Sequence, residues 1–132
     1  MGAFLNDDIM ACLDTNVIIE YMKGNKKIID LVNSYALKEE ISSTAITEYE
    51  LWKYYDQRKI KQISILESIK MYSFDRPAAK KAAEIFNLLK EKGKLINEND
   101  MLIAAMALAN RETLITSDKD FNEIGDDRIL VI

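Results

Sequence analysis

The stretch Ile9-Met10-Ala11-Cys12-Leu13-Asp14-Thr15-Asn16 sets the fold class of this chain. It begins with an apolar run, which is typical of a strand covered on both faces in a parallel sheet. A carboxylate, Asp14, ends the run, and a helical pattern over Val17–Met22 follows. Ligands of open α/β sheets bind beyond the carboxyl ends of the strands. Asp14 is therefore a candidate ligand-binding residue, and equally a candidate N-cap for the helix that follows.

Strand and helix patterns alternate along the rest of the 132-residue chain. We expect further strands at Glu40–Ser43, Met71–Phe74, Thr113–Thr116 and Ile129–Ile132. We expect helices at Val17–Met22, Lys26–Leu37, Ala45–Gln57, Ile60–Ile69, Pro77–Glu91 and Asn99–Asn110. This alternation indicates a three-layer α/β/α fold, in which helices flank a central, mostly parallel sheet of four or five strands. A chain of this length is expected to form a single domain, 1-132.

The composition excludes several kinds of chemistry. The chain has no histidine, which excludes zinc sites with histidine ligands, Ser-His-Asp hydrolysis and histidine general-base catalysis. The net charge of −4 argues against a nucleic-acid binder held by a large basic surface, but not against an acidic site that binds phosphates through a metal. The single cysteine, Cys12, lies in an apolar run and is expected to be a small buried side chain.

The sequence shows no sign of a membrane segment or a leader. No apolar run approaches the ~18 residues needed to span a bilayer. The N-terminus lacks a basic region followed by a cleavable apolar core. We therefore expect a soluble, cytoplasmic protein with no membrane partner, and residues 1–8 are expected to form a short N-terminal extension.

Four carboxylates stand where a parallel α/β fold would bring them together: Asp14, Glu48, Asp100 and Asp118. Asp14 and Asp118 follow short apolar runs, whereas Glu48 and Asp100 each open a helical pattern on its apolar side. Each acid alone is also explained as a helix cap or as a charge favoured by the helix dipole. Independent capping explains four acids in equivalent topological positions less economically than one shared site does.

Helical periodicity favours Glu48 over Glu50 as the second acid. The residues three, four and seven positions after Glu48 are Leu51, Trp52 and Tyr55, so Glu48 is predicted to begin the buried stripe of its helix. Glu50 is predicted to face solvent or to form a surface ion pair.

Asp118 competes with Asp120 for the fourth position, since both follow the strand Thr113–Thr116. Asp118 is favoured because it is closer to the end of the strand. Thr116 lies two residues earlier and is expected to orient Asp118 or a bound water through its hydroxyl. Asp118 is also a candidate cap for the turn at 119–124.

Four clustered carboxylates need a cation, because like charges at a low effective dielectric repel one another. An all-oxygen donor set points to Mg²⁺ or Mn²⁺. Such an ion lowers the pKa of a bound water and stabilises the charge that develops on phosphoryl oxygens. The expected chemistry is metal-assisted attack of water on a phosphodiester.

At these residues the chain resembles the PIN-domain nucleases, and within them the VapC-type toxins of toxin–antitoxin pairs. The matching segments are Leu13-Asp14-Thr15-Asn16, Thr44-Ala45-Ile46-Thr47-Glu48-Tyr49-Glu50-Leu51, Asn99-Asp100-Met101-Leu102-Ile103-Ala104-Ala105 and Thr116-Ser117-Asp118-Lys119-Asp120-Phe121. Their order and spacing cover essentially the whole chain. The resemblance implies a PIN-like fold with catalytic metal ligands at Asp14, Glu48, Asp100 and Asp118, supported by Asn16 and Thr116.

The resemblance also implies an activity and partners. It implies a Mg²⁺- or Mn²⁺-dependent endoribonuclease that cleaves single-stranded or looped RNA, usually as a homodimer inhibited by a small, VapB-like antitoxin protein. The alternative is a non-catalytic PIN-like module, in which the acids serve as caps and the protein acts only through a protein partner. RNA cleavage in the presence of Mn²⁺ distinguishes the two.

Overall fold

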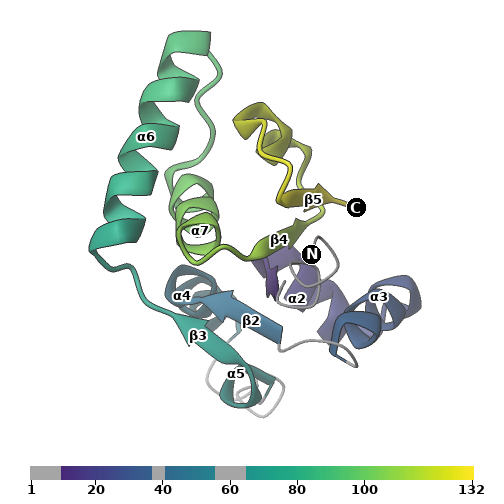
Figure 1. Ribbon diagram of the computed structural model, residues 1–132. Helices are drawn as coiled ribbons and strands as arrows, with labels where there is room; N and C mark the ends of the chain where they lie inside the picture. The colour runs from purple at the N-terminus through teal and green to yellow at the C-terminus, as the bar shows by residue number, and fades with distance from the viewer. Residues whose placement is uncertain (1–9, 37–40, 56–64) are drawn as a thin grey trace, which may run out of the picture.

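The computed structural model describes residues 10–36, 41–55 and 65–132. Within them, five strands form one parallel sheet in the order β3-β2-β1-β4-β5 (Figure 1). The strands are β1 (Ala11–Leu13), β2 (Ile41–Thr44), β3 (Lys70–Tyr72), β4 (Thr113–Thr116) and β5 (Ile129–Val131). The helices are α2 (Thr15–Met22), α3 (Lys26–Ala36), α4 (Ala45–Tyr54), α5 (Ile65–Ser68), α6 (Arg76–Lys92), α7 (Glu98–Ala109) and the 3₁₀ helix η2 (Lys119–Ile124). The predicted α/β class with a parallel central sheet is confirmed.

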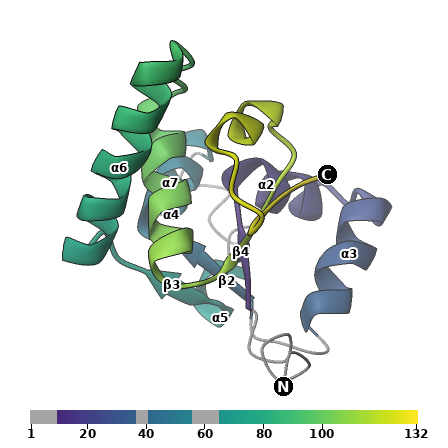
Figure 2. The ribbon, with the colours of Figure 1, turned by 45° about the horizontal axis from the view of Figure 1, so that its top comes forward.

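Helices cover both faces of the sheet and give the three predicted layers. One core cluster joins side chains of α6, α7 and η2 to Cys12 of β1 and Leu114 of β4. The other joins α2 and α3 to Ala11, Leu13 and Ile115 of the same two strands. Figures 1 and 2 show α6 and α7 on one side of the sheet and α2 and α3 on the other. The first strand is apolar throughout because its successive side chains point to opposite, equally buried faces.

The register of β1 and β4 places their carboxyl ends at the same edge of the sheet. Leu13 pairs with Ile115, and the backbone N–H of Asp14 donates to the carbonyl of Ile115 at 2.9 Å. Thr116, the last residue of β4, therefore lies beside Asp14. The helix α2 starts at the very next residue, so the end of β1 and the beginning of α2 share Asp14.

The helix α6 has sequence signals at both ends, and it holds α7 against the sheet. The carboxylate of Asp75 caps its start by accepting from the N–H of Ala78 at 3.1 Å, and Pro77 occupies the first turn. Gly93 ends it with φ 67°, a left-handed conformation that costs residues with a Cβ more than glycine. The buried side of α6, with Ala82 and Ile85, packs in one cluster with α7, which carries Asp100 in its first turn.

The third strand lies earlier than expected. The sequence predicts Met71–Phe74, but β3 ends at Tyr72 and Phe74 is 44% exposed. Its partner β2 ends at Thr44, which pairs with Tyr72, so there is no neighbouring strand for later residues to join.

Some expected segments lie partly or wholly outside the described residues. Of the helix expected at Ile60–Ile69, the described part is helical at Ile65–Ser68 and positions 60–64 are outside. The extension at 1–8 is outside too, as are positions 9, 37, 40, 56 and 57 at the ends of other expected elements.

The structure bears on the expected burial of Cys12 and on the expected lack of a membrane-spanning segment. Cys12 is fully buried, as predicted, and this burial raises the pKa of its thiol, which makes it a poor nucleophile. Among the helices of the described residues, none combines the length and the apolar character needed to cross a membrane.

Candidate active site

Asp14 is the buried centre of the acidic edge of the sheet. The residue is only 3% exposed, and its carboxylate accepts two hydrogen bonds. One oxygen accepts from the N–H of Thr15 at 2.8 Å, and the other accepts from the hydroxyl of Thr116 at 2.7 Å. Asp14 also has the extended backbone of an N-cap, with φ −71° and ψ 162°. The cap and the site residue are thus the same side chain.

A single hydroxyl connects two of the predicted acids. Thr116 is fully buried, and its oxygen donates to Asp14 while accepting from the backbone N–H of Asp118 at 3.0 Å. Ser117 lies between Thr116 and Asp118, and its backbone N–H donates to the side-chain oxygen of Asn16 at 3.4 Å. Asn16 and Thr116, which were expected to support the site, therefore lie at it.

Asp118 caps η2 and lies closer to the site than Asp120 does. One oxygen of Asp118 accepts from the N–H of Asp120 at 2.9 Å, which is the cap that the sequence predicted as the alternative role. The negative charge of Asp118 acts on both Asp14 and Asp100, whereas that of Asp120 acts on Asp100 with the smallest effect of the four acids around it. Asp120 is also exposed. The geometry therefore favours Asp118 as the fourth acid.

The structure reverses the predicted places of the two glutamates on α4. One oxygen of Glu50 accepts from the hydroxyl of Thr15 at 2.5 Å, and the other accepts from the side-chain amide of Asn99 at 3.3 Å. Glu50 thus lies between α2 and the start of α7, and its charge acts on Asp14 and Asp100. Glu48 instead accepts from the indole N–H of Trp52 at 3.1 Å. The expectation that Glu48 faces the site and Glu50 faces solvent is wrong.

The prediction failed because the inward-facing positions of α4 are not all apolar. The buried positions of this helix are Thr47 and Leu51, and Trp52 is 43% exposed. The hydroxyl of Thr47 contacts those of Thr44 and Thr15 at 3.2 Å each, so this side of the helix is polar. The sequence does carry a signal for it, because Thr44, Thr47 and Glu50 are spaced by three and share one helical face.

Asp100 completes the group of acids from the first turn of α7. Its side chain is half-buried, and burial raises the pKa of this carboxyl to about 7, with further upward contributions from the charges of Asp14, Asp118, Glu50 and Asp120. Burial likewise raises the pKa of Asp14 to about 6, against the opposing effect of the hydrogen bonds from Thr116 and Thr15. Asp14, Glu50, Asp100 and Asp118 therefore share one electrostatic environment.

These shifts predict that the metal-free protein gains stability as the pH falls from 7.5 to 5. Both carboxyls have a pKa in the folded state above that of the unfolded chain, so the folded state binds more protons in this window. The midpoint of thermal unfolding in a chelator should rise by roughly 3–8 °C. The rise should be smaller in Asp100→Asn, which lacks one of the two groups. An equal rise in both proteins would mean that Asp100 does not titrate abnormally.

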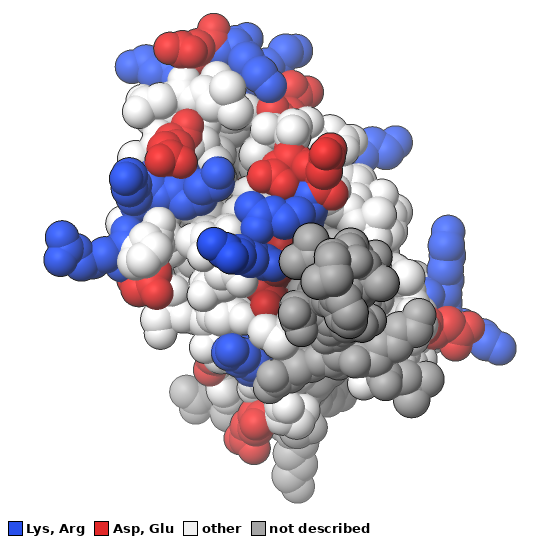
Figure 3. All heavy atoms as spheres, in the orientation of Figure 1, with Lys and Arg blue, Asp and Glu red and all other residues white. Residues whose placement is uncertain are grey.

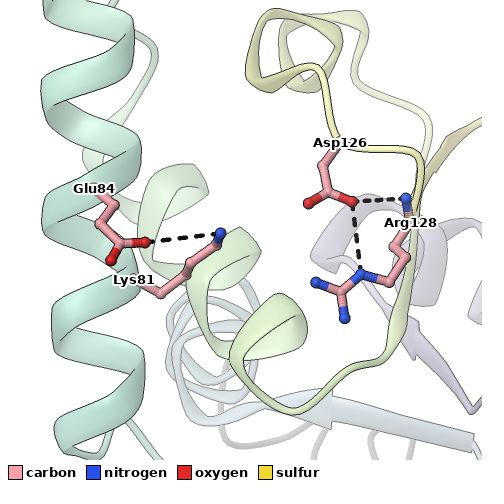
Figure 4. A network of polar contacts seen from close by, with 4 residues as sticks. All are labelled: Lys81, Glu84, Asp126 and Arg128. Atoms are coloured by element: carbon pink, nitrogen blue, oxygen red, sulfur yellow. Dashed lines mark hydrogen bonds and ion pairs between the residues drawn. The ribbon is translucent and has the colours of Figure 1, made fainter.

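The chemistry of this group fits a hard divalent cation. All four side chains offer carboxylate oxygen, and every charge that acts on Asp14 or Asp100 within the described residues is negative. Two ion pairs of the described residues lie away from this group: Lys81 lies 3.9 Å from Glu84 on α6, and Arg128 lies 3.6 Å from Asp126 before β5 (Figure 4).

The four carboxylates do not form a preorganised metal-binding site. Among residues 10–36, 41–55 and 65–132, no three of them converge closely enough to hold one ion with their side chains as they lie. The single metal-sized cluster expected from the sequence is therefore not formed by these side chains as they lie.

The PIN domain family matches residues 11–127, a span that includes all four acids. The chain therefore belongs to the PIN domain family.

Similar proteins agree with this assignment. The chain is 35% identical over 96 residues to "Ribonuclease VapC3" of Methanocaldococcus jannaschii, an alignment that covers 73% of this chain and 96% of that protein. It is 30% identical to a chain of VapBC-1 from nontypeable Haemophilus influenzae, with a TM-score of 0.76 and coverage of 93% of this chain and 96% of that one. A chain of VapBC2 from Rickettsia felis, solved bound to a DNA fragment from their promoter, superposes with a TM-score of 0.80 over 94% of this chain and 98% of that one. At 21% identity it supports the fold alone.

Proposed function

We propose that this protein is a metal-dependent endoribonuclease, which hydrolyses RNA phosphodiester bonds as the toxin of a toxin–antitoxin pair. The observation that carries the proposal is the group of four acids at the carboxyl edge of the sheet, with Glu50 in place of Glu48. Membership of the PIN domain family and the ribonuclease name of the Methanocaldococcus relative support it. A bound Mg²⁺ or Mn²⁺ would supply a Lewis acid there, which activates water and stabilises developing phosphoryl charge.

The residues of this chain have distinct parts in that chemistry. Asp14 is held from both oxygens, by Thr15 and Thr116, so it presents a fixed carboxylate at the end of β1. Glu50 is oriented by the hydroxyl of Thr15 and the amide of Asn99. These hydrogen bonds restrict the rotation of both carboxylates. Bringing three acids of the group around one ion would still require side chains to move.

Asp100 and Asp118 contribute the other two negative charges of the group. Asp118 is fixed at its backbone by the hydroxyl of Thr116, whereas Asp100 stands at the beginning of α7 near the positive end of the helix dipole. Asp14, Glu50, Asp100 and Asp118 would be the ligands of the ion. Their shared negative potential would disfavour RNA in its absence, since a phosphate chain brings further negative charge.

Removal of the metal tests this proposal directly. We expect purified protein to cleave a single-stranded or looped RNA in Mn²⁺ or Mg²⁺, and to stop when the ions are chelated. Activity should return when Mn²⁺ is added in excess of the chelator. The Asp100→Asn protein, prepared in parallel, controls for a contaminating nuclease. Cleavage that persists in chelator would reject a metal-dependent mechanism, and no cleavage under any condition would favour the non-catalytic alternative.

We also propose an antitoxin partner and a homodimer, with the protein acting in the cytoplasm, where its RNA substrate is. The support for the partner is the likeness to a chain of the Haemophilus VapBC-1 structure. The charge on one face of the molecule favours a substrate bound at a local site over one held by a broad basic surface. Figure 3 shows acidic and basic side chains interspersed over α6 and not gathered into one basic surface.

A further inference from the structure

A pocket lies beside Glu50, between α2 and α4. It has a volume of about 310 Å³ and is lined by Thr15, Ile19, Glu50, Lys53 and Tyr54. Thr15 and Glu50 hydrogen-bond to each other, so one wall of this pocket is part of the acidic site itself. The pocket therefore opens next to the place where a phosphodiester would react.

The other walls differ in chemistry from the acids. Lys53 brings a positive charge one helical turn after Glu50, and its ammonium lies 5.0 Å from the centre of the Tyr49 ring. Tyr54 is 59% exposed, and its ring lies edge-to-face with that of Tyr55, with centroids 4.9 Å apart and planes at 74°. The rim of the acidic site therefore combines three features: the exposed ring of Tyr54, which packs against Tyr55, the charge of Lys53 and the apolar side chain of Ile19.

We propose that this pocket binds one nucleotide of the RNA next to the cleaved phosphodiester, with Tyr54 stacking on the base and Lys53 pairing with a backbone phosphate. The inference rests on the proposed nuclease function and specifies how its substrate is held. Aromatic stacking accepts any base, because every base has a π face. A volume near 310 Å³ is at the lower end of small-ligand sites and suits a single base.

Charge explains why a nucleotide suits this pocket better than an apolar protein segment does. The acids around Asp14 repel a phosphate chain, so productive binding needs a positive group close by. Lys53 is that group in the pocket, and it lies three residues from Glu50 on the same helix. An apolar segment would leave the carboxylate of Glu50 and the ammonium of Lys53 desolvated without a matching charge.

The test measures affinity separately from cleavage. Binding of a fluorescent single-stranded oligoribonucleotide is followed by anisotropy in the Asp100→Asn background, so that the probe stays intact. Tyr54→Leu should weaken binding at least about fivefold, whereas Tyr54→Phe should retain it, because stacking needs the ring and not the hydroxyl. Lys53→Gln should weaken binding and reduce the slope of log affinity against log salt by about 0.7, the value for one phosphate contact on a single strand.

The chain supplies a matched control on α6. The ammonium of Lys90 lies 5.9 Å from the centre of the Phe86 ring, which is a cation–aromatic pair on another helix. Lys90→Gln and Phe86→Leu should leave both the affinity and the salt slope unchanged. In the active protein, Tyr54→Leu should raise KM with little change in kcat, as expected when an interaction shared by ground and transition states is removed.

The outcomes separate this inference from the proposed function. If the unaltered protein cleaves RNA in Mn²⁺ but Tyr54→Leu and Lys53→Gln bind RNA as well as the Lys90→Gln control, the pocket is not a nucleotide site. The same conclusion follows if these changes weaken self-association or inhibition by an antitoxin and leave RNA affinity intact. If the unaltered protein binds the oligonucleotide through Tyr54 and Lys53 without ever cleaving it, the pocket stands and the nuclease proposal fails.

Discussion

Replacing Glu50 with glutamine is expected to reduce RNA cleavage by at least about 10–100-fold, the loss that is typical when even a residue that orients a metal ligand is removed. The same change at Glu48 should leave the rate within about twofold, which is typical of a surface substitution. The two residues lie on the same short helix, yet Glu50 contacts Thr15 and Asn99 at the site while Glu48 contacts the exposed Trp52. Initial rates at saturating Mn²⁺ measure the difference.

The pair of variants is its own control, because both remove one negative charge and keep the size of the side chain. A Glu50→Gln protein that unfolds at no lower temperature than Glu48→Gln excludes a folding defect as the cause. The opposite result, with Glu48→Gln inactive and Glu50→Gln active, would mean that the working enzyme turns α4 differently from the structure described above.

Asp100→Asn is expected to abolish cleavage and at the same time to raise the unfolding midpoint of the metal-free protein by roughly 3–6 °C. Within the described residues the charges that act on Asp100 are all acidic, so removing its charge relieves repulsion. Such an exchange of function for stability is common at charged sites. Added Mn²⁺ should stabilise the unaltered protein and have a much weaker effect on the variant.

A matched carboxylate outside the site controls this experiment. Asp30 is exposed on α3, and Asp30→Asn should change neither the cleavage rate nor the unfolding midpoint by more than about 1 °C. Unchanged RNA cleavage in Asp100→Asn would reject its catalytic role, whatever happened to the stability.

Much of the fold follows from local patterns in the sequence. The apolar run of β1, the helix signals at Asp75, Pro77 and Gly93, and the alternation of strand and helix patterns are properties of short segments. They identify the elements and indicate a parallel sheet. They also place Asp14 and Asp118, because the end of a buried strand is visible in sequence and parallel strands end at one edge.

Hydrophobic periodicity could not predict which face of α4 turns toward the site. Hydrophobic periodicity locates the face of a helix that packs on an apolar core, but α4 follows β2 directly and turns Thr47 and Glu50 toward a polar site. Such a helix is buried through hydroxyl and carboxylate contacts, which hydrophobic periodicity does not detect. The relevant signal was the three-residue spacing of Thr44, Thr47 and Glu50.

Glu112 shows a second limit of sequence reasoning. Its carboxylate is 1% exposed and accepts from the hydroxyls of Ser42 at 2.7 Å and Tyr72 at 2.8 Å. These partners are 70 and 40 residues away along the chain. A buried acid of this kind depends on hydrogen bonds that exist only after β2, β3 and β4 have assembled. The burial of Glu112 therefore cannot be predicted from a local sequence pattern.

The double role of Asp14, as cap of α2 and as site residue, affects how an inactive protein should be made for work in cells. An Asp14→Ala genotype would remove the cap and leave the buried hydroxyl of Thr116 without its acceptor. Survival of cells that carry this allele would not distinguish loss of catalytic activity from low protein abundance, because destabilised chains are degraded. Asp100→Asn separates the two, because it is expected to accumulate as a stable, inert protein. It is therefore the better bait for capturing an intact RNA or an antitoxin in vivo.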